Sequence, residues 1–125
     1  MKLRIHGNSI RLRLNQADVT ALAASGRVAA YLEFADSGHF TYALAASDAV
    51  SAAEARFENG GLTVYVPRAR AEEWISSDAV AVTDDSSRRA LGPEIIVEKD
   101  FACLQKRAGE DDAGTFPNPA YNRLF

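Results

Sequence analysis

The sequence predicts a single α+β domain, residues 1–125, in which two helices pack on a mostly antiparallel sheet of about six strands. Several short segments alternate apolar and polar residues, which is typical of half-buried strands. Two other segments space their apolar residues at the helical period. A chain of 125 residues, 47% hydrophobic and 25% charged, has the size and composition of one globular domain.

Residues 2–6 and 10–14 alternate as strands do, and Gly7-Asn8 is either a turn between two strands or a bulge within one. Their polar positions are basic, and residues 1–14 contain no acid. The cations are Lys2, Arg4, Arg11 and Arg13. This face is either a solvated strand surface or a docking surface for an anion or an acidic segment, the chain's own tail included.

The first helix is predicted to begin after Asn15, whose side chain can accept a hydrogen bond from a first-turn amide. Asp18 stands in the first turn, where the helix dipole favours a carboxylate. Gly26 is free to adopt the left-handed conformation that ends a helix. The residues expected on the buried face are Val19, Leu22 and Ala23.

The middle of the chain predicts two strand pairs. Segments 28–34 and 39–44 are joined by a short turn, so they must run antiparallel. Segments 53–58 and 62–66 flank Asn59-Gly60-Gly61, a strong hairpin signal because asparagine and glycine accept positive φ angles.

The second helix is predicted over residues 68–76, directly after Pro67. Its buried side is expected to carry Ala71, Trp74 and Ile75, so the tryptophan is interpreted as core. A strand at 80–82, a polar loop at 84–89 and a last strand at 94–98 follow. Residues 99–125 are predicted to form an irregular, docked C-terminal tail.

The two halves of the chain share an order of elements, strand, helix, strand, strand. A shift of 52 residues places Leu14 on Val66 and Leu22 on Trp74. Four identities accompany this match between residues 12–34 and 64–86. An internal duplication and a chance similarity of small α+β domains both remain open.

The segment after the last strand is the main candidate for chemistry. It combines the single cysteine with several carboxylates, and zinc accepts thiolate, imidazole and carboxylate ligands together. The candidate ligands of a divalent metal are Cys103, Glu98, Asp100 and Asp111, with Glu110, Asp112, His6 and His39 as further donors. The alternatives are a core cysteine and a solvated acidic loop, since no paired cysteine or histidine spacing supports a dedicated site.

The tail also carries a candidate docking element. Phe116-Pro117-Asn118-Pro119 favours an extended backbone next to an aromatic anchor. It is expected to cover a sheet edge of its own chain or of a second subunit. The carboxylates of residues 110–112 are then expected to meet Arg11 and Arg13. Arg11, Arg13, Phe116 and Pro117 are therefore the predicted interaction residues.

The chain resembles a family of bacterial proteins of unknown function. The resemblance spans essentially the whole chain and rests on its opening and closing segments. They are residues 2–14, the motif Glu98-Lys99-Asp100-Phe101-Ala102-Cys103-Leu104, residues 110–112 and Phe116-Pro117-Asn118-Pro119. The resemblance implies no activity, so every role is argued from the residues themselves.

Composition and motifs narrow the function classes. A net charge of −3 gives no reason to expect nucleic-acid binding, and no apolar run is long enough to span a membrane. A single cysteine fits a reducing cytoplasm. No phosphate-binding, dinucleotide or nucleophile motif is present, which leaves an enzyme unsupported. The leading prediction is a non-enzymatic cytoplasmic domain that acts through protein–protein contacts, with a homodimer as one option. The alternative is a metal-binding or thiol-based site in residues 98–112.

Overall fold

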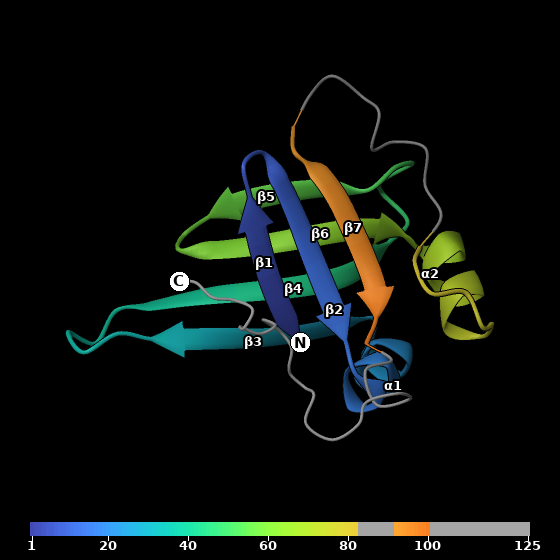
Figure 1. Cartoon of the computed structure of the whole chain (residues 1–125), viewed down its shortest axis with the longest axis horizontal. Coiled ribbons are helices and arrows are strands. Elements are labelled where there is room, and N and C mark those ends of the chain that lie inside the picture. Colours follow the sequence, from blue (N-terminus) through green and yellow to red (C-terminus); the bar gives the residue numbers. More distant parts are fainter. Residues whose placement is uncertain (83–91, 101–125) are drawn as a thin grey trace, which may run out of the picture.

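The computed structural model describes residues 1–82 and 92–100. Seven strands and two helices make up this part of the chain (Figure 1). In chain order they are β1 (Lys2–His6), β2 (Ser9–Leu14), α1 (Gln16–Ser25), β3 (Arg27–Glu33), β4 (His39–Ser47), β5 (Glu54–Glu58), β6 (Gly61–Pro67), α2 (Arg68–Ile75) and β7 (Glu94–Lys99). Neither helix is both long and apolar enough to cross a membrane.

The strands form two mixed sheets, so the prediction of one sheet of about six strands was wrong. The first sheet has the order β1-β2-β7 and the second has the order β3-β4-β6-β5. In Figure 1 the first sheet lies across the face of the second. The α+β class is confirmed, with strands as the larger part. Period-two alternation defines which face of a strand is buried but not which strand lies beside it, so the sequence did not separate the sheets.

The hairpins β1–β2 and β5–β6 each pair with a strand from the other half of the chain. The hairpin β1–β2 pairs with β7, and the hairpin β5–β6 pairs with β4; both of these added pairings are parallel. The three hairpin-type pairs, β1–β2, β3–β4 and β5–β6, are antiparallel. The two halves are therefore interlocked, since neither half completes a sheet from its own strands.

The register of the two hairpins repeats at the spacing that the sequence suggested. Lys2 pairs with Arg13 and Glu54 pairs with Tyr65, an offset of 52 at both positions. The burial pattern of β2 also recurs in β6, with every second residue buried. The repeated unit is a hairpin followed by a helix and a strand that joins the other hairpin.

The core lies between the sheets and beneath the helices. The inward residues of β2, β4 and β6 are almost fully buried, and Leu22 and Trp74 enter the same cluster from the two helices. Trp74 also donates a hydrogen bond from Nε1 to the carbonyl of Val80 at 3.0 Å, which satisfies its polar atom in the core. The interpretation of Trp74 as a core residue is confirmed.

The ends of α1 follow local sequence rules. Asn15 accepts from the amide of Asp18 at 2.9 Å and Asp18 accepts from the amide of Asn15 at 3.0 Å, which is a capping box. Gly26 ends the helix at φ 80°. Leu22 is buried as expected and Val19 is partly buried, whereas Ala23 is exposed, so the buried face of this helix is narrower than predicted.

Two further elements differ in length from the prediction. The predicted strand 80–82 is an isolated bridge, Ala81 opposite Glu98, next to β7. β4 runs on to Ser47 because its C-terminal part pairs with β6 as well as with β3. The hairpin turn is as predicted, with Asn59 at φ 54° and Gly60 at φ 75°. The predicted loop 84–89 lies outside the described residues.

Candidate functional site

The outer face of the first sheet carries the basic residues that the sequence singled out. β1 and β2 turn their apolar residues to the core and their cations to this face. Their register sets like charges directly opposite each other, Lys2 against Arg13 and Arg4 against Arg11. Such cross-strand pairs are destabilising, so this array of four cations needs nearby anions.

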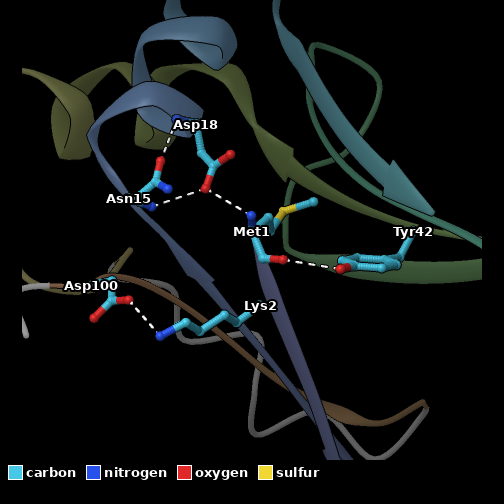
Figure 2. Close-up of polar contacts among 6 residues, drawn as sticks. All are labelled: Met1, Lys2, Asn15, Asp18, Tyr42 and Asp100. Carbon is cyan, nitrogen blue, oxygen red and sulfur yellow. Dashed lines mark hydrogen bonds and ion pairs between the residues drawn. The ribbon is translucent and has the colours of Figure 1, made fainter. Parts of the chain in front are cut away.

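Two carboxylates from the end of β7 supply part of that compensation. Glu98 accepts a hydrogen bond from Arg13 Nε at 2.8 Å and lies 3.7 Å from Arg11 Nη1. Asp100 lies 3.0 Å from Lys2 Nζ (Figure 2). Both carboxylates are largely buried, with side-chain exposures of 14% for Glu98 and 13% for Asp100. The sequence had placed Glu98 and Asp100 in a metal site, and the structure gives both of them cationic partners.

Of the four predicted metal ligands, the structure describes only Glu98 and Asp100. Among residues 1–82 and 92–100, no three His, Cys, Asp or Glu side chains gather closely enough to hold an ion. His39 instead packs the edge of its ring against Tyr31, with ring centroids 6.2 Å apart. Cys103 and Asp111 lie outside the described residues, so a metal or thiol role of this segment stays a prediction.

The predicted contacts of the tail stay predictions for the same reason. Phe116, Pro117 and residues 110–112 lie outside the described part of the chain. Among the described residues, both Arg11 and Arg13 lie close to Glu98. The basic face thus has a carboxylate partner on the neighbouring strand that sequence spacing did not identify.

A hollow of about 240 Å³ opens among the basic side chains. It is lined by Lys2, Leu3 and Arg4 from β1 and by Arg11 and Arg13 from β2. Arg4 is exposed and forms no ion pair with a described residue. Within the described part of the chain, the Arg4 guanidinium thus stands without a carboxylate partner beside a concave, basic surface.

A second hollow, which the sequence did not predict, opens between the sheets beside the turn at Gly7-Asn8. This apolar mouth has a volume of about 330 Å³ and includes Ile5, Phe40 and Phe57. Ile5 and Phe57 are 61% and 67% exposed, although they lie on the inward faces of their strands. Phe40 and Phe57 stand with ring centroids 6.3 Å apart. At this end the two sheets do not pack over each other, so inward-facing side chains remain exposed. The alternation of apolar and polar residues shows which face of a strand points inward, but not where the opposite sheet ends.

The N-terminus is tied into the fold near the basic face. Figure 2 shows the Met1 ammonium 2.9 Å from Asp18, the same carboxylate that closes the capping box of α1. The Met1 carbonyl accepts a hydrogen bond from the Tyr42 hydroxyl at 3.0 Å. These contacts join β1, α1 and β4, and they fix the start of the basic strand.

The second sheet has an edge at β3, which is the lowest of the four strands of this sheet in Figure 1. This strand pairs only with β4 among the described residues. It exposes Tyr31 and Leu32, and it carries one charge of each sign at its ends, Arg27 and Glu33. Neither end residue forms an ion pair with another described residue.

The opposite edge of the same sheet is β5, where, unlike at β3, two charged residues pair with each other. Arg56 donates a hydrogen bond to Glu54 at 2.7 Å, and this bond together with the charge of Glu54 raises the pKa of the Arg56 guanidinium. Arg56 also lies 5.1 Å from the centre of the Tyr65 ring. The charges of Arg56 and Glu54 are thus paired within this strand.

Comparison with known proteins identifies a family but no activity. No curated protein and no solved structure matches this chain. A family of unknown function (DUF7009) matches residues 1–120, which is nearly the whole chain. The protein is therefore a member of the DUF7009 family.

Proposed function

We propose that this protein is a non-enzymatic cytoplasmic domain that acts through protein–protein contacts, and that its first partner is a second copy of the chain. In this proposal two β3 strands pair antiparallel across a two-fold axis and join two four-stranded sheets into one. The proposal rests on two observations: β3 pairs only with β4 among residues 1–82 and 92–100, and its sequence is complementary to itself. That sequence is Arg27-Val28-Ala29-Ala30-Tyr31-Leu32-Glu33.

Backbone geometry supports this pairing. At the two ends of β3, the Gly26 carbonyl and the Phe34 amide are bonded on the β4 side. Hydrogen-bonding direction alternates along a strand, so the even-numbered residues face β4 and the odd-numbered ones face the open edge. No strand in the described part of the chain uses the outward amides and carbonyls of Arg27, Ala29, Tyr31 and Glu33, so a partner strand could pair with them.

Side-chain chemistry selects one register. If Ala30 lies opposite Ala30 of the second copy, Arg27 lies opposite Glu33, and this ion pair is formed twice by symmetry. The remaining pairs in this register join Val28 to Leu32 and Ala29 to Tyr31. Opposite charges and aromatic or β-branched pairs are the combinations that favour strand pairing. A shift of two residues would lose both copies of the ion pair.

Two other edge strands lack this property. Antiparallel self-pairing of β5 about its centre would place Arg56 opposite Arg56 and Glu54 opposite Glu58. Self-pairing of β1 would place Arg4 opposite Arg4. Like charges opposite each other oppose pairing, which is a common protection of edge strands. β3 is the one of these three edges on which self-pairing is electrostatically favourable.

The proposed dimer would carry two apolar mouths, one from each copy of the chain. The apolar mouth lies toward the end of the sheet where β3 finishes and β4 begins, since Phe40 lines it and pairs with Leu32. Antiparallel pairing of two β3 strands would set the two mouths at opposite ends of the joined sheet. A partner with two apolar anchors would then gain from binding both mouths at once.

Charge reversal tests this proposal. Glu33→Arg would place the new guanidinium opposite Arg27 at both symmetry-related positions, so we expect the dimer to weaken by about tenfold or more. The double variant Arg27→Glu/Glu33→Arg restores opposite charges and is expected to recover the dimer. Sedimentation equilibrium of the full-length chain measures both changes.

The control is Glu58→Arg, which makes the same charge change on the β5 edge and is expected to leave association unaltered. A wild-type chain that stays monomeric at millimolar concentration would refute the dimer. Equal weakening by Glu58→Arg, or no recovery in the double variant, would refute the β3 register. Thermal melting of each variant distinguishes a lost contact from a lost fold.

We also infer that the two halves arose by duplication of one hairpin–helix–strand unit. The inference is supported by the common offset of 52 residues in both hairpins and by the equivalent places of Leu22 and Trp74 in the core.

A further inference from the structure

We propose that the basic hollow on the outer face of β1 and β2 binds the phosphate group of a small phosphorylated molecule. This inference is independent of the proposed dimer, because it concerns the other sheet. It starts from the cross-strand register, which sets Lys2 opposite Arg13 and Arg4 opposite Arg11. A strand pair that carries only cations on one face repels itself, and an anion bound among them relieves that repulsion.

The compensation provided within the described residues is incomplete. Glu98 accepts a hydrogen bond from Arg13 and reaches Arg11 only at 3.7 Å, while Asp100 pairs with Lys2. Arg4 has no carboxylate partner among the described residues. In residues 1–82 and 92–100, two carboxylates therefore contact this array of four cations, and the excess positive charge lies at Arg4 beside Arg11.

The geometry of the donors selects the class of anion. Guanidinium groups present several N–H donors in one plane and bind phosphate or carboxylate through paired hydrogen bonds. Arg4 and Arg11 stand on adjacent strands, so one tetrahedral oxyanion can accept from both. A doubly charged phosphate monoester offers more acceptor oxygens and more charge than a single carboxylate.

The size and surroundings of the hollow select a small ligand. Its volume of about 240 Å³ lies below the range of roughly 300–1,000 Å³ that is usual for pockets enclosing whole ligands. It can therefore hold a phosphate group while the rest of the molecule stays in solvent. On the β7 side, Glu94 and Glu98 lie beside Ser9 and Arg13. These carboxylates would repel a long polyanion such as a nucleic acid.

The test is a titration of the full-length, ¹⁵N-labelled chain with inorganic phosphate at low salt, at a pH where the dianion predominates. We expect saturable shifts of β1 and β2 amides with one phosphate per chain. Arg4→Gln is expected to lower the affinity by at least about tenfold. The same variant is expected to melt no lower than wild type, because it removes a like charge opposite Arg11. That combination separates a ligand contact from a structural role.

Arg70→Gln, which makes the same charge change on α2, is the matched control and should leave the affinity unaltered. Shifts that do not saturate, equal loss in Arg70→Gln, or equal binding of acetate would overturn the proposal. A full-length variant with Glu110→Gln, Asp111→Asn and Asp112→Asn tests the chain's own acidic segment as the occupant. Unchanged phosphate affinity in this variant is expected; a tenfold or greater increase would assign the hollow to that segment instead.

Discussion

At the scale of single residues, Asp18 connects the first helix to the start of the chain. Its carboxylate accepts from the Asn15 amide at 3.0 Å and lies 2.9 Å from the Met1 ammonium, so it both caps α1 and holds the start of β1 (Figure 2). Met1 as a whole is partly buried, and the Asp18 side chain is only 16% exposed. An ion pair that is shielded in this way is worth more than one at an open surface.

We expect Asp18→Asn to lower the free energy of unfolding by about 1–2 kcal/mol, because it weakens the cap and removes the ion pair. Chemical denaturation of the full-length chain measures this change. The control is Asp48→Asn, whose carboxylate is 80% exposed and pairs with Arg68, and which is expected to change stability by less than about 0.5 kcal/mol. Equal effects of the two substitutions would contradict the special role of Asp18.

At the scale of elements, the hairpin β5–β6 depends on its turn. Asn59 and Gly60 both have positive φ angles, the conformation of a tight turn that matches the twist of the strands it joins. The turn also touches the neighbouring strand, since the Thr41 amide donates to the Gly60 carbonyl at 3.2 Å. A change in the turn therefore disturbs both pairings of β6.

Gly60→Ala is expected to destabilise the protein by about 1 kcal/mol, because an alanine side chain disfavours the left-handed conformation at φ 75°. No atom blocks the new methyl group, whose nearest neighbour would lie 3.7 Å away, so the cost arises from backbone conformation alone. Gly38→Ala is the comparison, since Gly38 also lies in a hairpin turn but does not have a positive φ angle. The melting temperatures of both variants measure this difference. If Gly38→Ala lowers the melting temperature as much as Gly60→Ala does, the positive φ angle is not the cause of the destabilisation.

At the scale of the whole molecule, the exchange of strands between halves is the feature that organises the fold. β2 is completed by β7, and β6 is completed by β4, so each sheet contains strands from both halves. The core residues Leu12 and Val64, 52 positions apart, are both fully buried between the two sheets. Neither half can bury its inward residues without the other.

Cleavage of the chain between residues 50 and 51 tests this dependence. The cut falls in the segment between β4 and β5, outside every strand and helix. We expect fragments 1–50 and 51–125 to be unfolded alone and to form a folded one-to-one complex when mixed, because each supplies the missing strand of the other's sheet. Circular dichroism and amide dispersion report the outcome. A fragment that folds by itself with native-like dispersion would contradict the interlocked arrangement.

The sequence predicted which residues form the basic face, but it did not predict which residues contact them. The basic positions of residues 1–14 were correctly assigned to the polar side of their strands. Glu98 was placed in a metal set because it neighbours other acids along the chain, whereas it contacts Arg13, 85 residues away. The apolar mouth at Ile5 and Phe57 was missed because both residues fit the pattern of core positions.

The sequence by itself determined the local structure of this protein. The cap at Asn15, the helix end at Gly26, the turn at Asn59-Gly60 and the inward face of β2 all follow from preferences that act over a few residues. Only the tertiary structure decided how the strands divide between two sheets. The parallel pairings β2–β7 and β4–β6 join distant segments, and their register depends on how the inward side chains of both sheets pack together.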